Sequence, residues 1–123
     1  MTTTSPHNST MLSFLGSLDP YWESQLLVEY SKKFFTCKVL DGKVMDGRYR
    51  VVYGVIYFHD RIYLTKKSKL KKEILHVAYE ALSSRHVDFI ESYHTIMEGF
   101  YWENLKEYVY QHIIRYVTCL MYE

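Results

Sequence analysis

The sequence has few cysteines, prolines and glycines and no long apolar run. Its 123 residues include only 2 Cys, which do not provide a disulfide framework, so we expect a reducing intracellular compartment, nuclear or cytoplasmic. No apolar stretch approaches the roughly 20 residues of a membrane helix, and residues 1–10 lack the features of a secretory signal. Because the sequence has no such apolar stretch, we expect no membrane partner. The 5 glycines are isolated, which excludes a glycine-rich phosphate loop.

An excess of charge of one sign is also missing from the chain as a whole. The 15 Lys and Arg nearly balance the 14 Asp and Glu, which excludes a uniformly basic coat. Locally the balance fails, because residues 61–72 contain six basic side chains and no acid, whereas residues 73–123 have a net charge of −5. The six are Arg61, Lys66, Lys67, Lys69, Lys71 and Lys72. They are our candidates for nucleic-acid binding. The alternative is a solvated helix start, where positive charge opposes the helix dipole.

Apolar spacing predicts a helix before residue 36 and three helices after residue 68. Apolar residues between 21 and 35 recur every three or four positions, as in an amphipathic helix, and Asp19 before Pro20 fits a helix start. Three further stripes cover residues 70–82, 89–97 and 105–116, with Ser68 as a cap for the first. Helices this short cannot each bury a face alone, so we expect a three-helix bundle.

Between these helical segments the period changes to two. Residues 50–53, 55–58 and 61–64 are rich in β-branched and aromatic side chains, and Gly54 and His59-Asp60 separate them. This pattern predicts a three-stranded antiparallel meander with tight turns. The predicted fold class is α+β, with a flexible leader at 1–18, a helix and meander at 19–66, and a helical bundle at 67–123.

The order of these motifs resembles a known family. The succession consists of the strand Tyr57-Phe58-His59-Asp60-Arg61-Ile62-Tyr63-Leu64, the Lys-Ser-Lys-Leu-Lys-Lys stretch at 67–72 and the helical segment. Later markers agree with it: His86, Tyr93, Ile96, Phe100, Trp102, Leu105-Lys106, Val109 and Cys119. Over residues 20–123 the chain resembles the integrase zinc-binding domain, with its N-terminal extension, of plant gypsy-type LTR retrotransposon polyproteins.

The resemblance implies a zinc site of two histidines and two cysteines that ties the helices together. Carried onto this chain, the four ligand positions are Tyr79, His86, Tyr116 and Cys119. Neutral phenol is a poor zinc ligand, so we expect no cofactor and two rings in place of the metal. The alternative that keeps zinc is the set His76, His86, His112 and Cys119.

The resemblance also implies a function. In the family this module contacts DNA and neighbouring subunits, and strand transfer is performed by two Asp and a Glu in a separate domain. The sequence offers no substitute for that catalytic set, so we expect no enzyme activity. The predicted function is DNA binding or oligomer assembly by a retrotransposon-derived module. The alternatives are a co-opted protein-interaction module that binds neither DNA nor zinc, and a decayed element fragment without a function.

Overall fold

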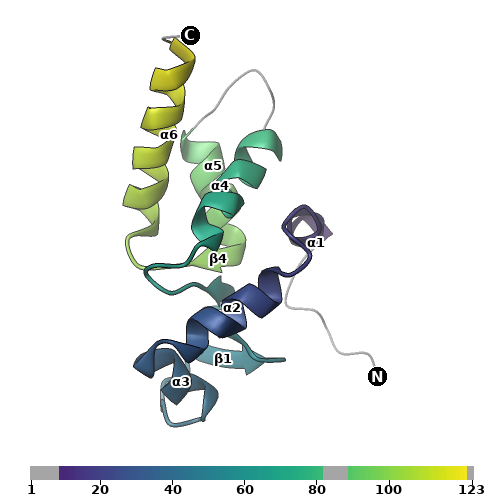
Figure 1. Ribbon diagram of the computed structural model, residues 1–123, viewed down its shortest axis with the longest axis vertical. Coiled ribbons are helices and arrows are strands. Elements are labelled where there is room, and N and C mark those ends of the chain that lie inside the picture. The colour runs from purple at the N-terminus through teal and green to yellow at the C-terminus, as the bar shows by residue number, and fades with distance from the viewer. Residues whose placement is uncertain (1–8, 82–88, 122–123) are drawn as a thin grey trace.

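The computed structural model describes residues 9–81 and 89–121, and within them the side chains of residues 12–78 and 93–115. The elements follow in the order α1 (Ser9–Gly16), α2 (Trp22–Ser31), α3 (Phe34–Leu40), β1 (Tyr49–Val52), β2 (Val55–Phe58), β3 (Arg61–Tyr63), α4 (Leu70–Ala81), α5 (Phe89–Gly99), β4 (Phe100–Tyr101) and α6 (Leu105–Met121). The predicted α+β class is confirmed. Figure 1 shows α4, α5 and α6 in the upper half and α2 crossing in front of the sheet below them. None of the described helices has the length and apolar character needed to cross a membrane.

The three predicted strands form the meander, and a fourth strand that the sequence did not predict joins them. β1 pairs with β2, and β2 with β3, both antiparallel. Both turns have two residues with positive φ, 51° and 82° at Tyr53-Gly54 and 50° and 62° at His59-Asp60, which matches the right-handed twist of the strands. The prediction of three strands was incomplete, because β4 pairs parallel to β3 and completes a four-stranded sheet among the described residues. A strand of two residues is too short for its period to be visible in the sequence.

The single helix predicted over residues 21–35 is two helices, α2 and α3. Lys33 between them is extended, with φ −119° and ψ 132°. The hydroxyl of Thr36 donates to the carbonyl of Tyr30 and lies 3.0 Å from the carbonyl of Lys33. A side chain of α3 therefore satisfies the end of α2, where a continuing helix would use its own N–H groups. Apolar spacing does not detect this break, because both helices contribute residues to the same core.

Tyr30 connects α2 to the sheet through hydrogen bonds of its hydroxyl group. Its side chain is fully buried, and its hydroxyl donates to the carbonyl of Tyr63 at 2.6 Å and accepts the N–H of Ile56 at 3.3 Å. The β2–β3 ladder pairs Tyr57 with Ile62, so the next step would join Ile56 to Tyr63, and the hydroxyl bridges the strands there. Burial raises the pKa of Tyr30 far above its ordinary value, which keeps the phenol protonated.

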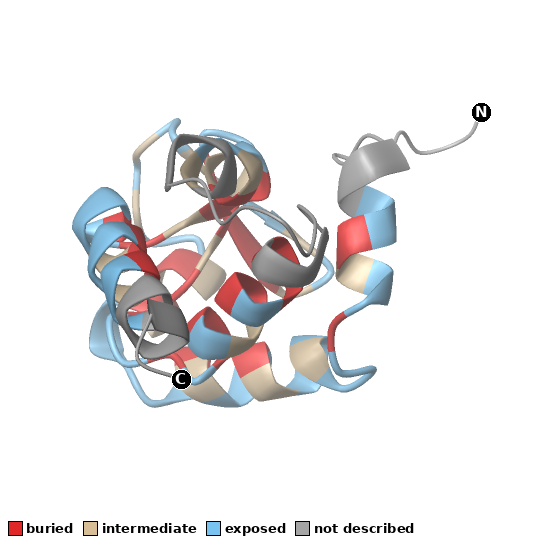
Figure 2. Ribbon diagram, turned by 90° about the horizontal axis from the view of Figure 1, so that it is seen from above, coloured by how far each residue is buried: buried red, intermediate tan, exposed pale blue. Residues whose placement is uncertain are grey.

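Buried side chains from both predicted folding units form one cluster. It includes Leu26 of α2, Ile56 of β2, Ile74 of α4 and Val109 of α6. In Figure 2 the buried segments of the ribbon gather toward the centre of the fold, between the helices. Trp102, directly after β4, is fully buried in the same cluster. The predicted boundary between residues 66 and 67 thus lies within a continuous core. The predicted three-helix bundle is also not separate, since α5 contacts β3 and β4 as well as α4 and α6.

Part of the predicted flexible leader is helical. In α1, Phe14 is buried, and its ring centre lies 5.5 Å from that of Phe100. Leu18, after the helix, is buried as well. The apolar residues of this helix are visible in the sequence, but their partner lies near the other end of the chain, so only the packing shows that α1 belongs to the core.

Candidate nucleic-acid interface

The basic stretch lies in the connection between β3 and α4 and in the first turn of that helix. Ser68 has its predicted role as a cap, because its hydroxyl accepts the N–H of Leu70 at 3.2 Å. The N–H of Ser68 donates to the carbonyl of Thr65 at 3.1 Å, which closes a tight turn. The turn leaves three lysines exposed: Lys66, Lys67 and Lys69.

Two lysines from outside the predicted basic stretch join this surface. Lys32 and Lys33, after the last turn of α2, line a depression of about 240 Å³ together with Lys67 and Lys69. The other lining residues are Gln25, Glu29 and Thr65. We call this hollow the four-lysine depression. A charge count along the chain separates the two lysine pairs, and only the crossing of α2 over the start of α4 brings them together.

Glu29, the acid in the depression, accepts three hydrogen bonds. Its Oε1 accepts the hydroxyl hydrogen of Ser68 at 2.5 Å, and its Oε2 accepts the N–H of Lys69 at 3.0 Å and an amide hydrogen of Gln25 at 2.9 Å. A carboxylate at the start of α4 also compensates the helix dipole. The depression therefore combines four exposed lysines with one carboxylate whose two oxygens both accept hydrogen bonds.

Lys71 does not belong to this surface, which corrects the prediction for that residue. Its side chain is only 4% exposed, and its ammonium donates to the carbonyl of Lys66. The ammonium also lies over the rings of Trp102 and Tyr108, 5.6 and 5.2 Å from their centres. Desolvation by burial lowers the pKa of Lys71. Its charge is used inside the fold in two cation–π contacts.

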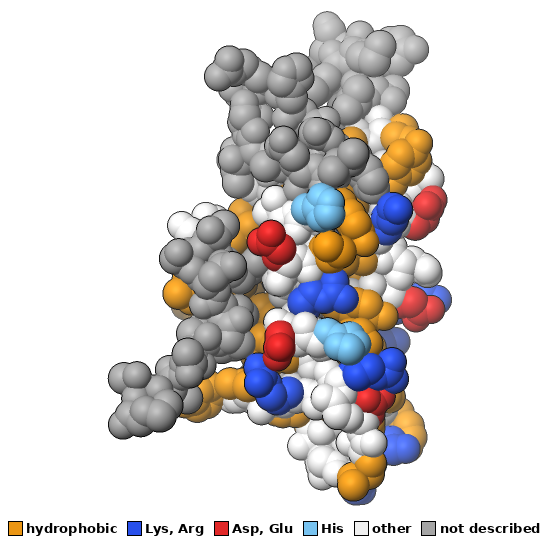
Figure 3. All heavy atoms as spheres, turned by 180° about the vertical axis from the view of Figure 1, so that it is seen from behind, with side chains coloured by type: hydrophobic (Ala, Val, Ile, Leu, Met, Phe, Trp, Pro, Cys, Tyr) orange, Lys and Arg blue, Asp and Glu red, His pale blue; other side chains and the backbone are white. Residues whose placement is uncertain are grey.

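Of the other predicted basic residues, Arg61 makes contacts within the fold, whereas Lys66 and Lys72 lie on the surface. Arg61 donates to the carbonyl of Met97 at 3.1 Å, and its guanidinium carbon lies 5.1 Å from the ring centre of Tyr101, so it joins β3 to α5 and β4. Lys66 and Lys72 are exposed but do not line the depression. Seen from behind, the described Lys and Arg side chains are mixed with Asp, Glu and His (Figure 3).

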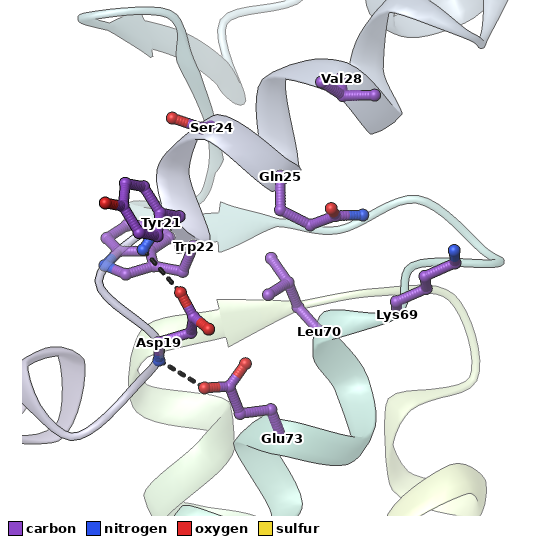
Figure 4. Close-up of a pocket in the computed structure, with 9 residues that line it drawn as sticks. All are labelled: Asp19, Tyr21, Trp22, Ser24, Gln25, Val28, Lys69, Leu70 and Glu73. Atoms are coloured by element: carbon purple, nitrogen blue, oxygen red, sulfur yellow. Dashed lines mark hydrogen bonds between the residues drawn. The ribbon is translucent and has the colours of Figure 1, made fainter.

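A second hollow of about 460 Å³ continues from the depression between α2 and the start of α4 (Figure 4). It is lined by Asp19, Tyr21, Trp22, Ser24, Gln25, Val28, Lys69, Leu70 and Glu73, and we call it the aromatic groove. The predicted helix start at Asp19 is displaced, because Asp19 lies in the turn before α2 and the helix begins at Trp22 with Tyr21 at its N-cap. Oδ1 of Asp19 accepts the N–H of Tyr21 at 2.8 Å within that turn. Its own N–H donates to Oε2 of Glu73, which connects the start of α2 to α4. The groove and the depression share Gln25 and Lys69.

The predicted zinc positions lie largely outside the described part of the chain. His86 is among the residues that are not described, and so are the side chains of Tyr79, Tyr116 and Cys119. Of the alternative ligands, His76 is exposed, and the ring of His112 stacks on Tyr108 with 4.2 Å between centres. Within the described residues, no three or more His, Cys, Asp or Glu side chains converge. Both metal hypotheses stay predictions.

Comparison with known proteins does not assign this chain to a family. No model of a protein family matches the chain. A search of curated proteins found no match either. The integrase resemblance therefore stays a prediction, and the function has to be argued from the residues themselves.

Proposed function

We propose that this chain binds the phosphate backbone of nucleic acid at the four-lysine depression. The observation that carries the proposal is the convergence of Lys32 and Lys33 with Lys67 and Lys69 around one hollow. Four cations held by two separate segments of a folded chain form a site for an anion with several charges. Nucleic acid is the polyanion that the integrase resemblance also implies as a partner.

The surroundings of the depression support an anionic occupant. The only carboxylate in its lining, Glu29, already accepts hydrogen bonds from Ser68, Lys69 and Gln25. Its repulsion of a phosphate is therefore offset by nearby donors and by the positive end of α4. The exposed Lys66 and Lys72 extend the positive charge along the chain on either side of Lys67 and Lys69.

The proposed role is non-catalytic. It is that of an integrase-like DNA-binding module in which the folded lysine cluster, and no metal, makes the contact. Assembly with further copies of the chain is compatible with this role, because the depression occupies only the surface between α2 and α4.

Charge reversal at the depression tests the proposal. Binding of labelled DNA is measured by fluorescence anisotropy at several salt concentrations for Lys32→Glu/Lys33→Glu and for Lys67→Glu/Lys69→Glu. We expect each double variant to lose at least about tenfold in affinity at low salt. We also expect the slope of log affinity against log salt to fall by about 0.7–0.9 for each lost phosphate contact.

The matched control is Lys43→Glu/Lys106→Glu. It makes the same change in net charge at two exposed lysines that line neither hollow. Equal losses in the control and in the depression variants would mean that net charge alone drives binding, and the proposed site would be wrong.

A further inference from the structure

The two hollows adjoin each other, one with a basic and the other with an aromatic lining. Gln25 and Lys69 line both of them, so a ligand that leaves the four-lysine depression along α2 enters the aromatic groove. In Figure 4 Lys69 lies toward one end of the groove, and Tyr21, Trp22 and Asp19 lie toward the other. The volume of the groove, about 460 Å³, is within the roughly 300–1,000 Å³ of sites for small organic groups.

The aromatic end is suited to a flat, uncharged ring. Tyr21 is 75% exposed, Trp22 is half-buried beside it, and the buried Leu70 contributes an apolar surface. The carboxylates of Asp19 and Glu73 at this end disfavour a phosphate. An occupant of the whole surface therefore needs an anion at one end and an aromatic ring with hydrogen-bond donors at the other.

We propose that the nucleic acid bound here is single-stranded, with its phosphates at the four-lysine depression and one unpaired base stacked on Tyr21 and Trp22 in the aromatic groove. The inference rests on the proposed function and adds the class of nucleic acid. A base in a duplex is stacked and paired, so it does not offer its face to protein rings, whereas every base of a single strand does. Basic grooves combined with aromatic platforms are the general solution for single-strand binding.

The two carboxylates also select among bases. Asp19 uses Oδ1 for the N–H of Tyr21, and Glu73 uses Oε2 for the N–H of Asp19. Among the described residues, no hydrogen bond engages Oδ2 of Asp19 or Oε1 of Glu73. Carboxylate oxygens accept hydrogen bonds from the exocyclic amino group of cytosine, whereas thymine has a carbonyl at the same ring position. Cytosine is therefore preferred over thymine.

Anisotropy with three labelled ligands of equal length tests the inference: oligodeoxycytidine, oligothymidine and a single strand in which abasic sites replace the bases. We expect oligodeoxycytidine to bind about tenfold more tightly than the abasic strand and more tightly than oligothymidine or a duplex. Tyr21→Ala should lower the affinity for oligodeoxycytidine to that of the abasic strand. The Tyr21 side chain makes no capping hydrogen bond and is 75% exposed, so we expect Tyr21→Ala to keep the circular dichroism spectrum of the wild type.

Two matched variants complete the experiment. Tyr53→Ala removes another exposed tyrosine, 88% exposed and outside both hollows, and should not change the affinity. Asp19→Asn keeps an oxygen for the N–H of Tyr21 but replaces the second oxygen with a donor, so it should abolish the preference for cytosine over thymine.

The possible failures are distinguishable. Full affinity for the abasic strand or the duplex, or for oligodeoxycytidine in Tyr21→Ala, would overturn the single-strand inference. The proposed phosphate site would survive that result if charge reversal at the depression still weakens binding. Unchanged binding after charge reversal would instead refute the phosphate site, and the single-strand inference with it.

Discussion

Lys69 and Lys71 belong to the same basic stretch, yet they have opposite surroundings. Lys69 is exposed and lines both hollows, whereas Lys71 is buried over Trp102 and Tyr108. Lys69 directly precedes α4 and Lys71 lies in its first turn. Each residue of a helix changes the side-chain direction by about 100°, so a short distance along the chain is enough to change from solvent to core. A run of lysines in the sequence therefore does not by itself define a basic surface, because the direction of each side chain decides whether its charge is exposed to solvent.

The largest expected effect concerns the ring beneath Lys71. Trp102→Ala should lower the free energy of unfolding by about 3–5 kcal/mol, because Trp102 is fully buried and its ring supports the ammonium. Urea unfolding followed by circular dichroism measures the change. Trp22→Ala is the matched control at a half-buried tryptophan and should cost clearly less. Equal losses in the two variants would contradict the difference in burial.

An intermediate effect is expected at Lys71 itself. Lys71→Ala removes the side-chain stem, two cation–π contacts and the donor to the carbonyl of Lys66, and it should cost about 2 kcal/mol of unfolding free energy. Lys67→Ala, at an exposed position of the same stretch, should change it by less than about 0.5 kcal/mol. The contrast between exposed and buried lysines of this stretch would fail if urea unfolding gave the same value for Lys67→Ala and Lys71→Ala.

The smallest effect is a dependence of stability on pH. Burial lowers the pKa of Lys71, so below the ordinary lysine pKa of about 10.4 there is a range in which the unfolded chain binds more protons than the folded one. Stability should therefore rise with pH in that range. In Lys71→Met the rise should be shallower, as measured by urea unfolding at a series of pH values. Identical slopes would show that Lys71 does not contribute to it.

This rise should end near pH 10. Burial raises the pKa of Tyr30 and Tyr108, so the unfolded chain loses its tyrosine protons first. Stability then falls with increasing pH in both proteins. The difference between wild type and Lys71→Met below that pH therefore isolates the lysine.

The strands and their turns could be predicted because their signals are local. Alternating β-branched and aromatic residues mark β1, β2 and β3, and Tyr53-Gly54 and His59-Asp60 are turn pairs with positive φ. The cap at Ser68 is local for the same reason, since it bonds the N–H of Leu70 two residues later. In each case the residues that form the structure are neighbours in the sequence.

The fourth strand, the break between α2 and α3 and half of the candidate site could not be predicted. β4 exists only through its pairing with β3, and the break depends on the contact of Thr36 with the carbonyl of Tyr30. Lys32 and Lys33 carry no distinguishing signal in a charge count, because their partners Lys67 and Lys69 lie in another segment. Each of these features requires knowledge of which segments are adjacent in space.

By itself the sequence determined the α+β class, the tight turns, the helix cap and the existence of a basic stretch. The tertiary structure alone decided which lysines of that stretch line the four-lysine depression. The hydroxyl of Tyr30 bridges Ile56 and Tyr63 and holds α2 across the sheet, and Glu29 joins α2 to the N–H of Lys69. These two contacts bring the end of α2 to the start of α4, so Lys32 and Lys33 meet Lys67 and Lys69. The physical reason is that propensity and periodicity act over a few residues, whereas a binding surface depends on contacts between segments far apart in the chain.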